Sequence, residues 1–220
     1  MTNTTKRICL IGEVMIELSG INCASNTARV GVAGDTYNTA VHMARLLKDS
    51  DWTVEYVTLL GQDGLSEQII TQMQAEAVST RLVGRHPDRL PGIYAIELDA
   101  AGERSFRYWR AQSAARRLFL DGLPDLAALD GADAVFLSLI TLAILPAEVR
   151  DPLIAKLVDL RAQGCLVAFD SNYRPALWPD AAQARLACSK MWAATSLALP
   201  SRDDEAKLWP GETIPETLGV

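Results

Sequence analysis

Segments with the pattern of strands alternate with segments with the pattern of helices along most of this chain, and no other feature constrains its fold as strongly. Short apolar runs predict strands at 6–12, 53–60, 134–140, 166–170 and 197–199. Amphipathic stretches predict helices at 35–48, 65–77, 147–163, 180–193 and from Asp203 onward. Because strands separated by helices pair in parallel, we predict an α/β fold with a doubly wound, mostly parallel sheet flanked by helices.

Two predicted helices carry capping residues. Asp35 or Thr36 is expected to cap the helix that follows the glycine-rich residues 31–34, because a side-chain oxygen accepts the free N–H groups of a first turn. Gly164 is expected to close the helix predicted at 147–163, since glycine readily adopts the left-handed conformation common at this position.

One stretch breaks the alternation and has the pattern of an antiparallel hairpin, with two extended runs and a connecting loop at 93–98, 104–109 and 99–102. Since side chains alternate along a strand, Phe106, Tyr108 and Arg110 share one face. Tyr94 lies on the partner strand. Such a face suits a polyhydroxy acid, with arginine on its carboxylate. It equally suits a solvated hairpin with cross-strand pairs.

Composition excludes several classes of partner. A net charge of −6 gives no reason for nonspecific attraction to nucleic acid or to an anionic membrane surface. The four cysteines are irregularly spaced, and Cys9 and Cys165 lie in apolar runs, so we expect small buried hydrophobes rather than disulfides or metal ligands. The N-terminal apolar run is too short for a signal peptide or a membrane span, and a cytoplasmic location is expected.

Familiar catalytic signatures are absent from the sequence. It has no GxxxxGK[ST] P-loop, no GxGxxG after a strand, no HExxH and no GxSxG. The two histidines, His42 and His86, lie in a predicted helix and beside a proline, where structural or solvated roles are expected. These absences remove most hydrolases and metalloenzymes, and the missing glycine fingerprint makes a Rossmann dehydrogenase a distant alternative.

Polar residues follow three predicted strands, at 12–13, 138–141 and 170–174. Ligands of open α/β sheets bind beyond the carboxyl ends of the strands, so these segments are candidate site positions. Arg174 is the strongest, because a guanidinium binds carboxylate or phosphate through two parallel hydrogen bonds. An ion pair between Arg174 and Asp170 within the loop would explain the same residues structurally. The glycines at 31–34 likewise suit either a ligand or a tight turn.

Taken together, these motifs resemble those of the 2-keto-3-deoxygluconate kinases, a group within the ribokinase-like (PfkB) carbohydrate kinases. The resemblance covers essentially the whole chain and is carried by residues 11–18, 34–40, 89–94, 102–104, 108–110, 169–178 and 203–209. It implies one ribokinase-like α/β domain over residues 1–220, incomplete at its C-terminal end. It also implies a small antiparallel β lid formed from about 14–33 and 91–112.

The resemblance implies a role for particular side chains. Those expected to bind the substrate are Gly34, Asp35, Asn38, Tyr94, Tyr108, Trp109, Arg110 and Arg174. Those expected on the nucleotide side are Asn172, Tyr173 and Arg174, with Arg174 also stabilising the transferred phosphate. The implied reaction moves the γ-phosphoryl group of ATP to the 6-hydroxyl of 2-dehydro-3-deoxy-D-gluconate with Mg²⁺. A homodimer formed through the lid is also implied. The alternatives are a kinase of a neutral sugar such as fructose or ribose, and a non-catalytic sugar-binding module.

The sequence departs from the family pattern at two points. Leu139 stands where a glycine is usual, and we expect it to narrow the substrate pocket. The second departure concerns the general base. In the family this is an aspartate in a glycine-rich segment of the Gly-Ala-Gly-Asp type, and no such segment occurs before Val220. We therefore expect the base to lie beyond Val220 and residues 1–220 alone to be inactive.

Overall fold

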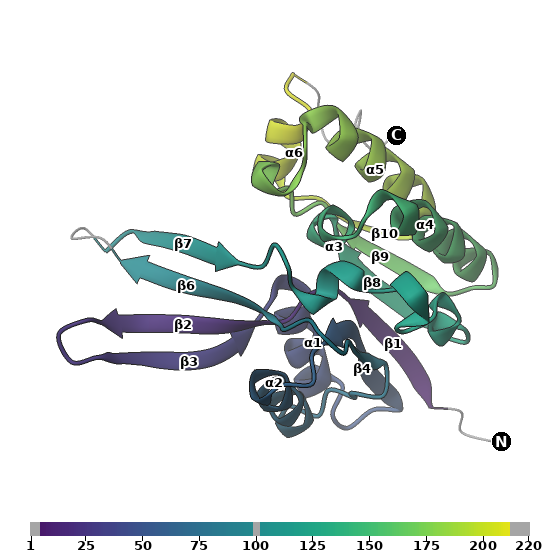
Figure 1. Cartoon of the computed structure of the whole chain (residues 1–220). Coiled ribbons are helices and arrows are strands. Elements are labelled where there is room, and N and C mark those ends of the chain that lie inside the picture. The colour runs from purple at the N-terminus through teal and green to yellow at the C-terminus, as the bar shows by residue number, and fades with distance from the viewer. Residues whose placement is uncertain (1–4, 99–101, 212–220) are drawn as a thin grey trace.

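The computed structural model describes residues 5–98 and 102–211, so most of the loop predicted at 99–102 lies outside it (Figure 1). Its main sheet has six strands in the order β10-β9-β8-β1-β4-β5. Their bounds are β1 (Lys6–Ile11), β4 (Trp52–Leu60), β5 (Val83–Arg85), β8 (Ala134–Ser138), β9 (Leu166–Asp170) and β10 (Leu197–Leu199). Every neighbouring pair is parallel, which confirms the predicted doubly wound sheet.

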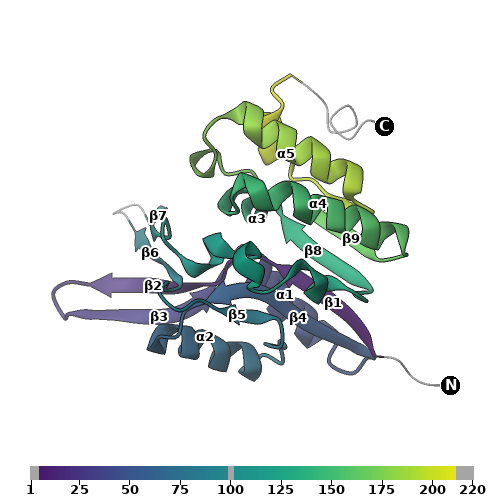
Figure 2. The same ribbon diagram turned by 45° about the vertical axis from the view of Figure 1, so that its right-hand side comes forward.

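Helices cover both faces of this sheet (Figure 2). They are α1 (Asp35–Leu46), α2 (Gly64–Ala75), α3 (Leu139–Ile144), α4 (Ala147–Ala162), α5 (Ala181–Ala194) and α6 (Arg202–Leu208). Short 3₁₀ helices are η1 (Ala114–Arg117), η2 (Leu120–Gly122), η3 (Leu126–Leu129) and η4 (Pro175–Leu177). The core consists of two hydrophobic clusters, and successive side chains of β1 alternate between them. Cys9 and Ile11 pack in the cluster with α3, α4 and α5, whereas Leu10 packs in the cluster with α1 and α2.

A second sheet projects from one end of the main sheet (Figure 1). It consists of β2 (Met15–Asn22), β3 (Thr27–Ala33), β6 (Gly92–Leu98) and β7 (Arg104–Trp109), in the order β3-β2-β6-β7. We call these four strands the lid. The predicted all-antiparallel pairing needs one correction, because β2 and β6 pair in parallel. Each hairpin is antiparallel, but the two are joined through strands that run in the same direction.

The predicted cap of α1 is wrong. Asp35 and Thr36 lie inside the first turn, and Gly34 is the N-cap, without a side-chain hydrogen bond. A Cβ atom at position 34 would lie 2.3 Å from the backbone oxygen of Glu13, so only glycine fits there. The side chains of Asp35 and Thr36 are used elsewhere; the Thr36 hydroxyl, for example, lies 2.8 Å from that of Tyr56.

The strand predicted at 134–140 is too long. It ends at Ser138, and residues 139–144 form α3, nearly all of them buried. Periodicity does not distinguish a buried helix from a buried strand when every side chain is apolar. The predicted end of α4 is confirmed, with Gly164 at a φ of 96°.

Within residues 5–98 and 102–211, no helix has both the length and the apolar character needed to cross a bilayer.

Candidate functional site

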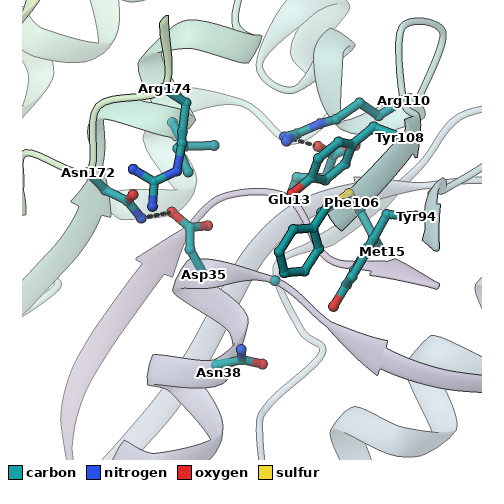
Figure 3. Close-up of a pocket in the computed structure, with 12 residues that line it drawn as sticks. Glu13, Met15, Asp35, Asn38, Tyr94, Phe106, Tyr108, Arg110, Asn172 and Arg174 are labelled. Carbon is teal, nitrogen blue, oxygen red and sulfur yellow. Dashed lines mark hydrogen bonds and ion pairs between the residues drawn. The ribbon is translucent and has the colours of Figure 1, made fainter. Parts of the chain in front are cut away.

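The strand order of the main sheet places a pocket beside β1. Because β4 lies on one side of β1 and β8 on the other, the chain connections leave β1 in opposite directions, and a crevice opens beyond the carboxyl ends of these strands. A cavity of about 190 Å³ lies there, between the strand ends and the lid (Figure 3). Its lining residues are Glu13, Met15, Gly34, Asp35, Asn38, Tyr94, Phe106, Tyr108, Arg110, Ile140, Asn172 and Arg174.

The lid contributes an aromatic wall to the pocket. The ring centroids of Tyr94 and Tyr108 are 5.7 Å apart, and Phe106 lies 6.3 Å from Tyr108. The Tyr94 hydroxyl donates a hydrogen bond to Glu17 on the neighbouring strand β2. Burial and that hydrogen bond raise the pKa of Tyr94 well above its usual value, so the hydroxyl keeps its proton at physiological pH.

Arg110 follows β7 and is held by two neighbours. Its guanidinium forms an ion pair with Glu13, and it lies 5.8 Å from the ring centroid of Tyr108. Both charged residues of the pair are buried, with exposures of 2% for Glu13 and 9% for Arg110. Burial raises the pKa of Glu13, and the positive charge of Arg110 acts in the opposite direction.

The opposite wall comes from the start of α1 and the loop after β9. The Asn172 side-chain amide donates a 3.3 Å hydrogen bond to Asp35 Oδ2, which also accepts one from the Ser138 hydroxyl. The other end of the Asn172 side chain, Oδ1, is buried without a hydrogen-bond partner in the described part of the chain. An unpaired buried acceptor is costly, so Oδ1 is a candidate acceptor for a ligand donor.

Arg174 enters this wall from the same loop. It donates to the backbone oxygen of Tyr173 at 2.8 Å and to the Asp204 carboxylate at 3.2 Å and 3.3 Å. Its side chain is half exposed, so the guanidinium remains accessible from the pocket. Burial raises the pKa of Asp170, and the negative charges of Asp35 and Asp204 add to that rise. Figure 3 shows Arg110 and Arg174 reaching the pocket from opposite walls.

The pocket gathers most of the site residues expected from the sequence. Those lining it are Gly34, Asp35, Asn38, Tyr94, Tyr108, Arg110, Asn172 and Arg174. Trp109 is not among them. It borders a separate apolar hollow with Leu65, Pro91 and Ile93, because neighbouring residues of a strand face opposite sides of the sheet. Tyr173 is also absent, being buried in the main core.

The expectation for Leu139 is wrong. Its side chain is fully buried in the main hydrophobic cluster and does not reach the pocket. The next residue, Ile140, lines the pocket instead. In the first turn of α3, successive side chains are rotated by about 100° about the helix axis. Ile140 therefore faces the pocket, whereas Leu139 faces the core.

Glu13 and Ile140 fall in the candidate segments 12–13 and 138–141, although neither was given a role. Sequence reasoning missed Met15 as a lining residue and Asp204 as the partner of Arg174. Glu13 had a visible signal, since it interrupts an apolar run directly after a predicted strand. Asp204 and Arg174 are 30 positions apart in sequence, so the residues around either one do not predict the ion pair.

The family model described as pfkB family carbohydrate kinase matches residues 5–218. The 2-dehydro-3-deoxygluconokinase of Dickeya dadantii is 43% identical over 217 residues, which cover 98% of this chain and 69% of the relative. The structure of a 2-dehydro-3-deoxygluconokinase from Thermotoga maritima superposes with a TM-score of 0.80 at 24% identity, covering 92% of this chain and 61% of that one. A Xylella fastidiosa fructokinase with bound ATP gives 0.78 at 22% identity, covering 98% and 62%. The two structures share the fold.

Proposed function

The chain belongs to the pfkB family of carbohydrate kinases, and on that premise we propose that it acts as a 2-dehydro-3-deoxygluconokinase. The reaction transfers the γ-phosphoryl group of ATP to the 6-hydroxyl of 2-dehydro-3-deoxy-D-gluconate. The observation that carries the proposal is a single pocket lined by two arginines from opposite walls, together with tyrosines of the lid. Such a set matches a small polyhydroxy carboxylate: cations for the acid group, and hydroxyl and amide groups for the sugar hydroxyls.

Each wall has its own task in this proposal. On the lid, Arg110 takes the substrate carboxylate, while Tyr94 and Tyr108 cover the carbon chain. On the sheet side, Asp35, Asn38 and Asn172 supply hydrogen-bonding groups near the N-terminus of α1. The position of the lid over the strand ends would exclude water, which otherwise competes with the sugar hydroxyl for the phosphoryl group.

Phosphoryl transfer depends on positioning and charge neutralisation more than on covalent chemistry. Arg174 suits that role because its guanidinium is half exposed and lies on the loop after β9. Mg²⁺ bound chiefly by phosphate oxygens needs only one or two protein carboxylates. No group of three or more His, Cys, Asp or Glu side chains that could hold a metal ion occurs among the described residues, and we assign no protein ligand to Mg²⁺. Mg²⁺ would supply neutralisation of the phosphate charge.

Isothermal titration calorimetry on residues 1–220 tests the substrate assignment. We expect 2-dehydro-3-deoxy-D-gluconate to bind more tightly than fructose, and Arg174→Ala to weaken binding of the acid by at least about tenfold. Tighter binding of fructose would overturn the choice of an acid. Unchanged binding by the Arg174→Ala protein would remove Arg174 from the anion site.

A neutral sugar is the second candidate, and one observation favours it. Each arginine of the pocket already has an acidic partner, Glu13 for Arg110 and Asp204 for Arg174, which lowers the net positive charge of the site. We favour the acid because the 2-dehydro-3-deoxygluconokinase of Dickeya dadantii is 43% identical over 98% of this chain.

Turnover is a separate question from binding. The two carboxylates that line the pocket are both engaged, Glu13 with Arg110 and Asp35 with Ser138 and Asn172. Neither is therefore poised to take the proton of the 6-hydroxyl, and we expect residues 1–220 to turn over ATP very slowly. A coupled assay of ADP release with the sugar acid measures this, and robust turnover would contradict the expectation.

A further inference from the structure

The buried ion pair between Glu13 and Arg110 joins the two parts of the molecule. Glu13 follows β1 of the main sheet, and Arg110 follows β7 of the lid. Glu13 and Arg110 are both at least nine-tenths buried. Figure 3 shows Arg110 above Tyr108, with a dashed line joining its guanidinium to Glu13.

Close packing restricts where the Glu13 side chain can lie. A Cβ atom on Gly92 would sit 2.7 Å from Glu13 Oε1 and 3.1 Å from Arg110 Cβ. A Cβ atom on Gly34 would sit 2.3 Å from the Glu13 backbone oxygen. Two glycines therefore make room for this residue, one beside its carboxylate and one beside its backbone.

We propose that Glu13 is the positioning residue for Arg110, fixing the guanidinium so that its remaining N–H groups serve the carboxylate of the bound sugar acid. The ion pair uses Nη2 of Arg110, and Nε is buried without a hydrogen-bond partner among the described residues. A guanidinium has five N–H donors in one plane, so holding one nitrogen orients the others. The inference rests on the proposed function, in which Arg110 takes the substrate carboxylate.

Two opposing effects follow from removing the Glu13 charge. Repulsion between Glu13 and the ligand carboxylate disappears, which favours binding. At the same time Arg110 becomes a buried cation without a partner, and such a group turns toward solvent. The second effect dominates, because the Nη2 contact with Glu13 is the ion pair that holds Arg110 inside the protein.

Calorimetry with 2-dehydro-3-deoxy-D-gluconate separates these effects. The Glu13→Gln protein is expected to bind the acid at least about tenfold more weakly than the unmodified chain. Glu97→Gln is the matched control, since Glu97 pairs with Arg107 at 3.1 Å on an exposed part of the same lid, and it should bind as the unmodified chain does. Equal or tighter binding by Glu13→Gln would overturn the proposal. If Glu13→Gln does not fold, Glu13→Asp replaces it; the shorter carboxylate should also weaken binding.

The pH dependence of binding gives a readout that a purely structural role would not move. Burial raises the pKa of Glu13, opposed by Arg110, Ser113 and Arg116. As the pH falls through that raised pKa, Glu13 takes a proton, Arg110 loses its anionic partner, and affinity for the acid falls. The other titratable groups nearby, Tyr56 of β4 and Asp35 of α1, are unchanged in Glu13→Gln, in which this fall should be absent. An identical pH profile for the two proteins would contradict the role of Glu13.

A ligand-free measurement keeps the inference separate from the proposed function. In ¹H–¹⁵N spectra of the unliganded chain, the Arg110 Nε–H should give a resonance protected from exchange, assigned by its loss in Arg110→Lys. That protection should disappear in Glu13→Gln and persist in Glu97→Gln. If the unmodified chain binds no sugar acid, the proposed function fails. Protection that persists in Glu13→Gln would instead refute the positioning role.

Discussion

At the scale of single residues, this pocket depends on which side of a strand each side chain faces. Tyr108 and Trp109 are neighbours in sequence and both aromatic, yet Tyr108 lines the pocket and Trp109 borders a hollow on the other side of the lid. The family motif assigned both residues to the substrate site, because a motif does not state which face of the strand each side chain occupies. Strand alternation separates them.

Substituting these two neighbours tests that distinction directly. Tyr108→Ala should weaken binding of the sugar acid about tenfold, since it removes part of the aromatic wall and the ring beside Arg110. Trp109→Ala is the control and should change affinity less than about twofold. Calorimetry measures both. A larger loss in Trp109→Ala than in Tyr108→Ala would show that the two faces of β7 have been assigned the wrong way round.

A second residue-scale prediction concerns glycine. Gly34→Ala should destabilise the chain by about 2 kcal/mol, because its Cβ atom would collide with the Glu13 backbone. Gly64→Ala offers a matched control at the start of α2, where an added Cβ meets nothing within 4 Å, and it should be neutral or stabilising by up to about 1 kcal/mol. Urea denaturation reports both values. Equal stability of the two variants would argue against the close approach at position 34.

At the scale of elements, most strands and helices follow from the sequence because their apolar periodicity is set by burial. The main sheet, the β6–β7 hairpin and the end of α4 are of this kind. The errors arose where periodicity carries no information. Nearly all side chains of α3 are buried, so the strand predicted at 134–140 runs two residues into this helix. The cap of α1 was set by a contact with Glu13, which lies 21 positions earlier in the chain.

The candidate site was predictable to a similar extent. Residues that follow strands, such as Arg174, or that share a hairpin face, such as Tyr94 and Tyr108, could be found from local pattern. The partners that orient them could not, because Glu13 with Arg110 and Asp204 with Arg174 are contacts between distant elements. Charge pairing across a fold depends on tertiary geometry, which no single segment encodes.

Between elements, an ion cluster around the buried Glu55 links β1 and β4. Glu55 of β4 accepts hydrogen bonds from Arg7 at 2.8 Å and from Arg81 at 2.7 Å. Burial alone would raise the pKa of Glu55, but the bonds from Arg81 and Arg7 outweigh it, and the net pKa is lowered. A carboxylate with a lowered pKa stabilises the folded state above its unfolded pKa.

Acidification should therefore remove that stability. The free energy of unfolding should fall as the pH drops below about 4.5, the ordinary range of a glutamate. Glu55→Gln should cost about 2 kcal/mol at pH 7 and flatten this part of the pH profile. Chemical denaturation between pH 3 and pH 7 gives both measurements, and an unaltered slope in the variant would contradict the assignment.

At the scale of the whole molecule, the lid exposes apolar side chains that a homodimer would cover. Leu98 and Phe106 are exposed on the face that carries Tyr94, and Val30 is exposed on the opposite face. We expect two copies to associate through the lid, in keeping with the resemblance, and sedimentation equilibrium measures the mass. Leu98→Glu should shift the mass toward a monomer, whereas Leu46→Glu, at an exposed position of α1, should not. A monomeric unmodified chain would dismiss this association.

The parallel pairing of β2 with β6 has a consequence for how a ligand enters and leaves. Hydrogen bonds between these strands join the two hairpins into one plate, so neither hairpin swings without the other. Opening the site must then rotate all four strands about the four connections to the main sheet, near Val14, Gly34, Pro91 and Arg110. Amide hydrogen exchange along β2, β3, β6 and β7 should accordingly slow together when a ligand binds, with one common opening free energy rather than two.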